Sequence, residues 1–367
     1  MREIIPILFL VLISVMTLFT SYKLATMLNL FKPYWLMIVF AVLTFTGIYG
    51  MRAIAHAVDP FKIVILKIGL VWLAFFIFTV TMVLIYTVIG RFLPISERIA
   101  AITILLFATI FCVYGYFNAQ SYKNITVEIP IENLPKELTI YHLSDVHLGT
   151  FGDKARMESL VKDMNKIKPD LVILNGDLVD GIKGITSDDL EPLAKAKPPV
   201  YFITGNHDIY VGVKEVREKL KAVGVKSLVN DIVELKGTQF VGLNYLRADN
   251  ESIDVTGSFG RITMEKLLPT LKLDRDKPII MIHHSPIGVK YMEKAGADLL
   301  ISGHTHAGQI FPFSLLAAIQ FKYMHGLYNY KSMQVYVSQG VGTFGPPIRL
   351  GSSGEASIIK LVPKKEA

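Results

Sequence analysis

The stretch Ile301-Ser302-Gly303-His304-Thr305-His306 decides how the rest of the sequence is interpreted. It ends the mostly apolar run 297–301, which predicts a short buried strand. An extended backbone sends alternate side chains to one side, so His304 and His306 can face the same space. Gly303 permits a sharp turn at the strand end and leaves room for a ligand. Two neutral imidazoles at such a place suit a divalent metal, and a pair of histidines in a surface turn is the alternative.

The same pattern recurs through the second part of the sequence, where short apolar strands are each followed at once by Asp, His, Asn and Gly. Helical stretches such as 153–168 and 214–223 separate the strands, which is typical of an α/β domain. Sheets of this kind bind ligands at the carboxyl ends of their strands, so five strand ends can converge on one site. The strands and the clusters that follow them are 138–143 with 144–147, 171–174 with 175–180, 200–203 with 204–208, 278–282 with 283–286, and 297–301 with 303–306.

These clusters supply oxygen and imidazole ligands and no thiolate, which suits Mn²⁺, Fe or Zn²⁺, with Mn²⁺ as our first choice. They hold more potential ligands than one metal needs. Two metals about 3.5–4 Å apart that share a carboxylate would use them, and a hydroxide between the metals is a strong nucleophile near neutral pH. The predicted chemistry is hydrolysis of a phosphate ester or anhydride by in-line attack. Taken singly, each Asp or Asn is more typical of a turn or a helix cap.

Taken in order, the clusters resemble those of the calcineurin-like metallophosphoesterases, and the resemblance covers residues 125–362. It implies a metallophosphoesterase domain, an α/β fold built as a two-sheet β-sandwich flanked by helices. The segments 326–328, 335–338 and 340–343 look like the membrane-bound bacterial branch, which includes enzymes resembling UDP-2,3-diacylglucosamine pyrophosphatase. The motifs that carry the resemblance are Asp145-Val-His147, Gly176-Asp177, Gly205-Asn206-His207-Asp208, a histidine two residues before Pro286, and Gly303-His304-Thr-His306.

The resemblance also implies a role for each matching residue. The first metal would be held by Asp145, His147 and His306, the second by Asn206, His284 and His304, and Asp177 would bridge both. His207 would face the phosphate and either stabilise the transition state or protonate the leaving group, and Asp208 would orient it. The family's histidine stands two residues before a proline, which selects His284 over His283. We therefore expect His283 to be a packed neighbour.

One departure from the branch is visible near the C-terminus. The branch has a Pro-Glu pair a few residues after an arginine, whereas this chain has Gly354-Glu355 after Arg349. We expect Arg349 to form a surface ion pair, and contact with substrate phosphate is the alternative.

Four apolar runs without an acidic or basic residue occupy the first third of the sequence and approach or exceed the roughly 20 residues that span a bilayer. The first run resembles a signal peptide, but it lacks a small-residue cleavage site and three further runs follow it. We therefore predict a transmembrane domain of four helices over residues 1–120 and a catalytic domain over residues 121–367. The runs are 4–20, 34–50, 68–90 and 99–117.

An even number of spans places both chain ends on one side, and the basic residues of the loops are too evenly divided to fix the orientation. We expect a multi-pass protein of the cell membrane. The spans lack the intramembrane charges that mark ion paths, which argues against a transporter. They are either an anchor or a platform that holds the tail of a lipid substrate. His56, in the short connection 51–61, is expected to be solvated.

The chain of 367 residues is 51% hydrophobic and has a formal net charge of +7. A basic balance fits an anionic membrane or a phosphorylated substrate. A basic block with interleaved aromatic residues is missing from the sequence, so we expect no nucleic-acid partner and no nuclease activity. The single cysteine, Cys112, excludes a disulfide framework. The sequence carries no indication of oligomeric state.

Two segments could set specificity. Residues 246–259 are polar and predict a surface loop or a recognition loop. Residues 311–330 are apolar and aromatic and follow the His304–His306 motif directly. Ordinary core is our first interpretation of this second segment, and a lip that touches the bilayer and admits lipid is the alternative.

The leading hypothesis is a membrane-integrated dinuclear-metal phosphohydrolase acting on a lipid-linked phosphate or pyrophosphate. A membrane-tethered phosphatase or phosphodiesterase for soluble substrates is the second hypothesis. A non-catalytic metal-binding scaffold is the third, and it predicts lost ligands, whereas every expected ligand residue is present.

Overall fold

The computed structural model of the 367-residue chain describes residues 4–53, 60–149, 151, 154–180, 187–251 and 262–364. The chain divides into two compact units. The first comprises residues 1–118 together with 345–350, and the second comprises 119–344 and 351–367. His56 and most of the predicted loop 246–259 lie outside the described residues.

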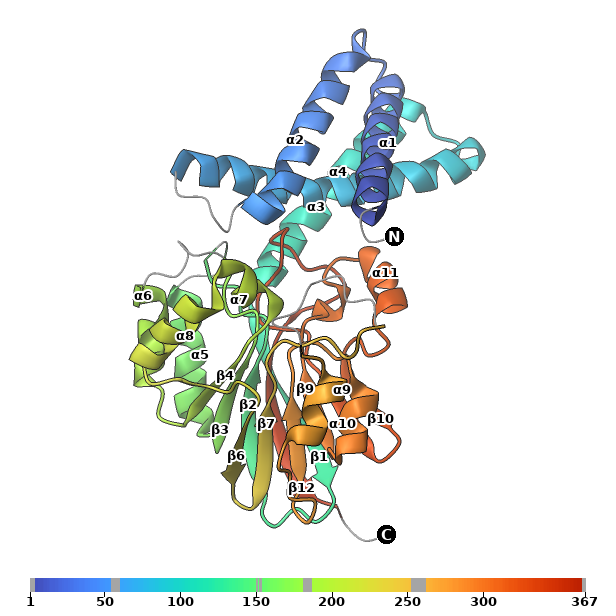
Figure 1. Ribbon diagram of the computed structural model, residues 1–367. Coiled ribbons are helices and arrows are strands. Elements are labelled where there is room, and N and C mark those ends of the chain that lie inside the picture. Colours follow the sequence, from blue (N-terminus) through green and yellow to red (C-terminus); the bar gives the residue numbers. More distant parts are fainter. Residues whose placement is uncertain are drawn as a thin grey trace. The chain divides into compact units, whose positions relative to one another are not determined.

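The first unit consists of long apolar helices (Figure 1). Four of its described helices are long and apolar enough to cross a membrane. Their outer faces expose large apolar side chains such as Leu12, Val42 and Ile102, which suits contact with lipid rather than water. The helices are α1 (Ile4–Met27), α2 (Pro33–Ala53), α3 (Pro60–Ile89) and α4 (Glu97–Gln120), with the short helix η2 (Gly90–Phe92) after α3.

Helices α2 and α3 approach closely because glycines face each other at their contact. A Cβ added at Gly47 would collide with the backbone of Gly69, and one added at Gly69 would collide with Gly47. The Trp72 Nε1–H donates to Thr44 Oγ1 across the same pair at 3.0 Å. Small residues and an interhelical hydrogen bond are the usual means of packing helices within lipid.

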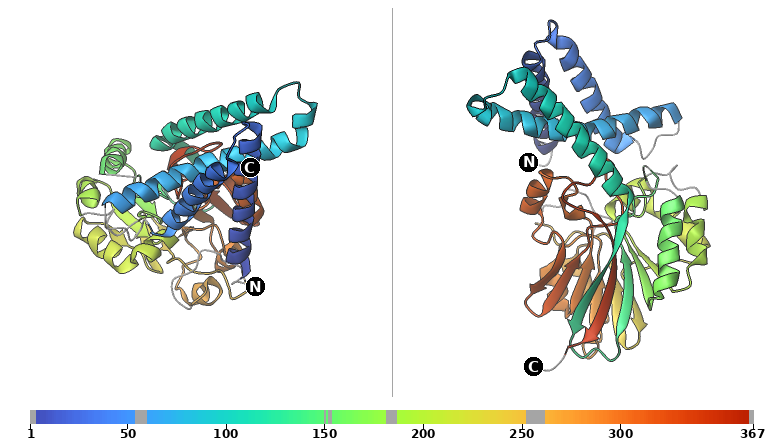
Figure 2. Two further views of the ribbon diagram at one scale, coloured as in Figure 1. Left: turned by 90° about the horizontal axis from the view of Figure 1, so that it is seen from above. Right: turned by 180° about the vertical axis from the view of Figure 1, so that it is seen from behind.

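The second unit contains two six-stranded mixed sheets among its described residues. The end of the chain enters the first sheet, where β12 lies between β1, to which it is parallel, and β2, to which it is antiparallel. Figure 2, from behind, shows β1 and β12 side by side. The first sheet has the order β1 (Tyr122–Ile131), β12 (Gly354–Pro363), β2 (Leu138–Leu143), β3 (Leu171–Asn175), β4 (Val200–Ile203), β5 (Lys226–Ser227), and the second β10 (Gly326–Tyr330), β11 (Met333–Val337), β9 (Leu299–Ser302), β8 (Ile279–Ile282), β7 (Thr238–Gly242), β6 (Asp231–Leu235).

The two sheets pack face to face through alternate residues of their strands. Ile140 and Ile173 of the first sheet and Ile280 and Ile301 of the second lie in one fully buried cluster. Successive strand residues point to opposite faces, so the intervening residues face away from this layer. Because the outer faces are buried as well, the strands read in the sequence as continuous apolar runs.

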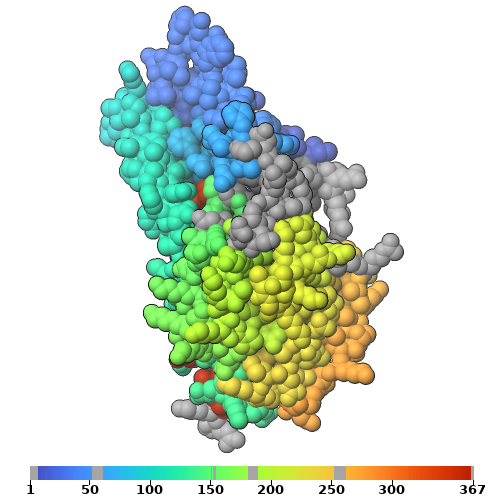
Figure 3. All heavy atoms as spheres, turned by 90° about the vertical axis from the view of Figure 1, so that its left-hand side faces the viewer, coloured from blue at the N-terminus to red at the C-terminus, as the bar shows by residue number. Residues whose placement is uncertain are grey.

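Helices cover the outer face of each sheet. The amphipathic helix α5 packs Met157 and Leu160 onto the first sheet, and α10 packs Met292 onto the second. Figure 3 shows the side chains of α5 to α8, in green to yellow, covering the first sheet's side of this unit. The helices are α5 (Lys154–Ile167), α6 (Ser187–Leu190), η3 (Glu191–Lys195), α7 (Asn206–Val211), α8 (Val213–Ala222), α9 (Met264–Leu267), η4 (Leu268–Thr270), α10 (Val289–Ala295), η5 (His306–Gly308) and α11 (Phe313–Gln320).

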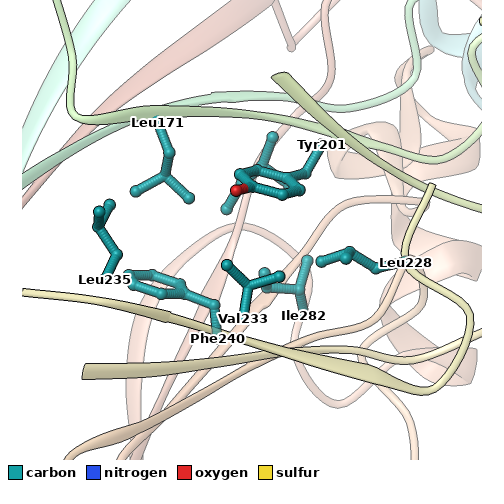
Figure 4. Close-up of a pocket in the computed structure, with 8 residues that line it drawn as sticks. Leu171, Tyr201, Leu228, Val233, Leu235, Phe240 and Ile282 are labelled. Atoms are coloured by element: carbon teal, nitrogen blue, oxygen red, sulfur yellow. The ribbon is translucent and has the colours of Figure 1, made fainter. Parts of the chain in front are cut away.

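A small cavity lies between the sheets, away from their polar ends. Figure 4 shows side chains from both sheets converging on it, among them Leu171 and Tyr201 from the first and Phe240 and Ile282 from the second. Its volume is about 10 Å³ and its lining is apolar. A space of this size and polarity is a packing gap and not a ligand site.

The predicted fold class is confirmed: four long apolar helices precede an α/β domain of two sheets flanked by helices. The predicted strands agree with β2 and β4 at both ends and with β3, β8 and β9 within two residues. The predicted membrane runs were shorter than the helices, because each helix continues through polar residues at its ends.

Candidate metal centre

The polar clusters follow the carboxyl ends of β2, β3, β4, β8 and β9, and backbone hydrogen bonds join them to one another. Asp145 N–H donates to Gly176 O and His147 N–H donates to Asp177 O, both at 3.0 Å, which pairs the loop after β2 with the turn after β3. Gly303 N–H donates to His284 O at 2.8 Å in the second sheet. The strand ends therefore form one continuous polar edge.

The backbone at this edge adopts a conformation that is uncommon for residues with a side chain. Five of the residues predicted as ligands have φ between 48° and 73°. Asp and His tolerate this left-handed region better than most residues, yet each such position costs about 1 kcal/mol or more. Strained residues of this kind cluster at functional sites. The five are Asp145, His147, Asp177, His304 and His306.

The first group of possible ligands is Asp145, His147 and His306. The His147 and His306 Nε2 atoms are 3.2 Å apart, and His306 Nε2 lies 3.2 Å from Asp145 Oδ1. The other carboxylate oxygen of Asp145 accepts hydrogen bonds from Ser144 Oγ and from the His304 N–H. Asp145 is thereby fixed with one oxygen directed at the two imidazoles.

The second group is Asp177, His284 and His304. His284 Nε2 lies 3.1 Å from Asp177 Oδ2 and 3.3 Å from His304 Nδ1. It also lies 3.7 Å from Asp145 Oδ1, so Asp145 stands between the two groups. Asp177 Oδ1 accepts the His207 N–H at 2.8 Å.

The arrangement of acceptors tests whether these residues fit a metal. The second ring nitrogen of His147 faces Asp180 Oδ1, and that of His284 faces the Asn175 carbonyl. Each Nδ1 is therefore assigned as the N–H, which leaves each Nε2 with a lone pair directed at a carboxylate or at another imidazole. Acceptors that face acceptors repel unless a proton or a cation lies between them. The donor set fits divalent metals, and carbonyl and carboxylate partners behind the imidazoles are what metal-ligating histidines use.

Asn206 is the remaining predicted ligand. It is the first residue of α7, directly after β4. Its Oδ1 is buried without a hydrogen-bond donor among the described residues. An amide oxygen buried in this way costs about 1–3 kcal/mol unless a cation or water satisfies it, which fits a ligand of the second group.

A third group consists of His147, Asp180 and His207. Asp180 Oδ1 lies 2.5 Å from His147 Nδ1 and 2.9 Å from His207 Nδ1. One carboxylate oxygen thus serves a predicted ligand and the predicted catalytic histidine. The sequence interpretation gave Asp180 no role, although it lies in the cluster 175–180 with Asp177.

Asp208, predicted to orient His207, has hydrogen-bond partners in the backbone. Its carboxylate accepts the N–H groups of Gly205, Asp177 and Leu178 at 2.8–3.0 Å. It therefore fixes the two turns after β3 and β4 against each other, while the carboxylate on the His207 ring is that of Asp180. Gly205 is needed at this contact because a Cβ there would collide with Asp177.

His283 lies beside the centre and is occupied elsewhere. Its Nδ1 is 2.6 Å from the Ser285 carbonyl, its Nε2 accepts the Leu246 N–H at 3.3 Å, and its ring stacks on Tyr245 at 5.5 Å. Burial lowers the pKa of His283 to about 4, so it is a neutral, packed side chain. His283 therefore packs against Tyr245, and His284 is the one of the two histidines in the second group.

The charge on His207 is set by the carboxylates around it. Burial opposes the charged imidazolium, but Asp177 and Asp180 outweigh it and raise the pKa of His207 to about 9. Burial likewise opposes ionisation of Asp180, yet His147 and His207 bring its pKa below the ordinary range. Burial and Asp177 raise the pKa of Asp208 to about 7. His207 is therefore suited to carry a proton toward a leaving group.

Two C-terminal residues differ from or extend the sequence interpretation. The expectation of a surface ion pair for Arg349 is wrong, because its side chain is fully buried and its backbone bonds to Gly115 and Asn118. Glu355 is buried as well, and accepts hydrogen bonds from Tyr336 Oη at 2.7 Å and Ser357 Oγ at 2.8 Å. The sequence interpretation did not predict that either side chain would be buried.

Two sheets whose strand ends carry these clusters of histidine and aspartate are typical of metal-dependent hydrolases of phosphoesters. The family model described as calcineurin-like phosphoesterase matches residues 138–308. An uncharacterized metallophosphoesterase of Helicobacter pylori is 34% identical over 266 residues, which is 69% of each chain. The chain belongs to the calcineurin-like phosphoesterase family, whose fold binds two divalent metals.

Two proteins of Danio rerio are also similar to this chain. A Danio rerio protein described as a transmembrane protein with a metallophosphoesterase domain is 33% identical over 279 residues, covering 70% of this chain and 61% of that protein. The crystal structure of a dimetal phosphatase from Danio rerio aligns with a TM-score of 0.42 and 13% identity, covering 65% of this chain and 94% of that one. Together with the apolar helices, the Danio rerio transmembrane relative indicates membrane association.

Proposed function

We propose that this protein is a multi-pass enzyme of the cell membrane that cleaves a phosphate ester or pyrophosphate bond of a lipid-linked substrate. The proposal assigns residues 1–120 to the membrane and 121–367 to catalysis. The observation that carries it is the set of imidazole and carboxylate acceptors that face one another at the strand ends. Such a set repels unless protons or cations lie between its members, and cations in a phosphoesterase fold serve phosphoryl chemistry.

In this proposal Asp145, His147 and His306 hold one metal, Asn206, His284 and His304 hold the other, and Asp177 bridges them. The donors suit Mn²⁺ first, with Fe or Zn²⁺ as alternatives. Two such ions would offset charge on the phosphoryl group and activate water. Every other step belongs to side chains of the chain itself.

His207 is the proton donor in the proposed reaction. A water oxygen that has lost one proton to solvent forms the new bond to phosphorus, and the bond to the leaving oxygen breaks in line. The His207 imidazolium gives its proton to the leaving oxygen and is reprotonated from solvent. Asp180 fixes the His207 ring through Nδ1. Asp208, through the three N–H groups it accepts, keeps the turns that carry Asp177 and His207 together.

The lipid part of the proposal rests on the apolar helices and on the resemblance to the membrane-bound branch that includes UDP-2,3-diacylglucosamine pyrophosphatase-like enzymes. Glu355 of that branch's Pro-Glu pair is retained here although the proline is not. A charged headgroup on an apolar tail is the substrate such an arrangement would suit.

The test uses full-length protein in detergent with added Mn²⁺. Phospholipids, polyprenyl pyrophosphates and diacyl sugar nucleotides are compared with soluble p-nitrophenyl phosphate by phosphate or nitrophenol release. Asp177→Asn should abolish all turnover while the protein remains folded, and Glu215→Gln, at an exposed surface pair, is the matched control. Full activity in Asp177→Asn would refute the bridging role, and a strong preference for the soluble ester would refute the lipid substrate.

A further inference from the structure

Helix α11 and Phe311, two residues before it, form an exposed apolar surface on the catalytic unit. Leu316 is 61% exposed, Ile319 is 83% exposed and Phe311 is 51% exposed. The helix has no buried residue among its eight and no charged side chain. The sequence expectation of ordinary core is therefore wrong for α11, and its apolar composition needs another explanation.

This surface is joined to the metal centre at both of its ends. The chain leaves the centre through His306 and the turn η5, and Ser314 N–H bonds back to Ile310 O as α11 begins. Directly after α11, the Phe321 ring packs edge-on against His304 with centroids 5.5 Å apart. Figure 1 shows α11 at the same end of the sheets as α7, which carries His207. An apolar surface thus begins where the phosphoryl group would sit.

We propose that α11 enters the bilayer interface and forms the apolar side of the entry for the tail of a lipid phosphate; this inference rests on the proposed function. A short helix that buries its apolar side in the headgroup boundary is a known mode of membrane contact. The occupant is lipid because the chain already carries bilayer-spanning helices. Only Ser121 separates the last of these helices, α4, from β1, so the connection between the two units is short.

The flanking residues agree with an interfacial position. Lys322 follows Phe321 at once, and its ammonium lies over the Tyr323 ring at 5.5 Å and the Tyr330 ring at 5.8 Å. Lys322 is exposed whereas Tyr323 is buried, so the lysine is the residue that can reach the headgroup level, with its apolar stem against the protein. Lys322 also offers a cation to anionic headgroups.

The first measurement locates α11 without reference to activity. Full-length protein with Cys112→Ser and Ile319→Cys is labelled with the fluorophore NBD and reconstituted in phosphatidylcholine vesicles with or without nitroxide lipid. Leu327→Cys, an exposed apolar position on β10, is the matched control. We expect nitroxide lipid to quench the label at 319 at least twofold more than the label at 327. Equal quenching, with equal access of aqueous iodide, would overturn the proposal.

The second measurement separates docking from catalysis. Leu316→Gln with Ile319→Gln alters only exposed side chains, and Ile125→Gln with Leu327→Gln is the control of equal polarity. We expect the α11 variant to lose about tenfold in kcat/KM on phosphatidate vesicles and to keep its rate on p-nitrophenyl phosphate. Equal loss on both substrates, or no loss on vesicles, would overturn the entry role. If the parent and every variant were inactive on both substrates, the proposed function would be refuted. The fluorescence measurement would still report whether α11 docks on the bilayer.

Discussion

Asp180→Asn is the substitution that most directly tests the geometry of the centre. One oxygen of Asp180 lies 2.5 Å from His147 Nδ1 and 2.9 Å from His207 Nδ1. Asparagine keeps the shape and one oxygen but removes the charge. The hydrogen bond from the neutral His147 ring then becomes neutral, and the bond from the His207 imidazolium keeps only the charge of its donor and loses its nearest counter-charge.

The expected loss follows from those two bonds. A hydrogen bond to a charged group contributes about 2 kcal/mol and a neutral one about 1 kcal/mol. Two bonds weakened by about 1 kcal/mol each give about 2 kcal/mol, which corresponds to roughly a 30-fold decrease in kcat. The effect on KM should be small because neither bond involves the substrate. Metal affinity should fall about tenfold or more through His147, as it does when the partner behind a ligating histidine is changed.

The assay is steady-state hydrolysis of p-nitrophenyl phosphate over a titration of Mn²⁺, with Glu215→Gln as the surface control. Asp208→Asn is the informative comparison, because its carboxylate accepts three backbone N–H groups and its partners are structural. That variant should lose about 1–3 kcal/mol of unfolding free energy, since one oxygen becomes an NH₂ group that faces an N–H. The reasoning fails if Asp180→Asn turns over at the parental rate, or if Asp208→Asn alone shows the loss of kcat at unchanged stability.

Three further outcomes are expected. Gly205→Ala should lower the unfolding free energy by about 1–3 kcal/mol and weaken metal binding, because its Cβ would overlap Asp177; an unchanged melting temperature would contradict this. His284→Ala should abolish metal-dependent hydrolysis, whereas His283→Ala should cost mainly stability, about 2–4 kcal/mol for a buried stacked ring, and a reversed pattern in paired kinetic and thermal measurements would exchange their roles. Although burial opposes ionisation of Glu355, hydrogen bonds from His325, Tyr336 and Ser357 lower its pKa from 4.5 to about 2; its contribution to stability is therefore complete above pH 4.5 and is lost as pH falls through 2. Denaturant unfolding between pH 6 and pH 3 should lose less stability in Glu355→Gln than in the parent, and identical pH slopes would exclude the effect.

Strands that are buried on both faces could be predicted from the sequence with little error. The runs that become β2, β8 and β9 are short and apolar, and each ends at a Gly, His or Asp cluster that cannot continue the strand. The pairing of those strands could not be predicted. β12 enters between β1 and β2 from more than 200 residues further along the chain, and no local pattern encodes a partner so distant.

Within the centre, residue types could be predicted and some partners could not. Asp208 is next to His207 in the sequence, whereas Asp180 lies in the earlier cluster 175–180, and both are carboxylates. The chain after β3 passes through a left-handed conformation at Asp177, with φ of 48°, and Asp180 three residues later lies against two imidazoles. Spacing along a chain does not report a left-handed turn at a residue other than glycine. The sequence did offer one signal for the role of Asp180, because it places a carboxylate three residues after Asp177.

Hydropathy alone also cannot tell a core helix from a helix that meets lipid, and α11 shows why. Its residues are as apolar as those of the strands, and the transfer free energy of a leucine side chain is nearly the same into a protein interior as into hydrocarbon. What separates the two cases is the number of faces that other elements cover. β8 is covered by a sheet on one face and α10 on the other, whereas α11 is held only at its ends, by η5 and by the Phe321 contact with His304. An uncovered apolar surface needs an apolar partner from outside the catalytic unit, and in our proposal that partner is the bilayer interface together with the tail of a lipid phosphate.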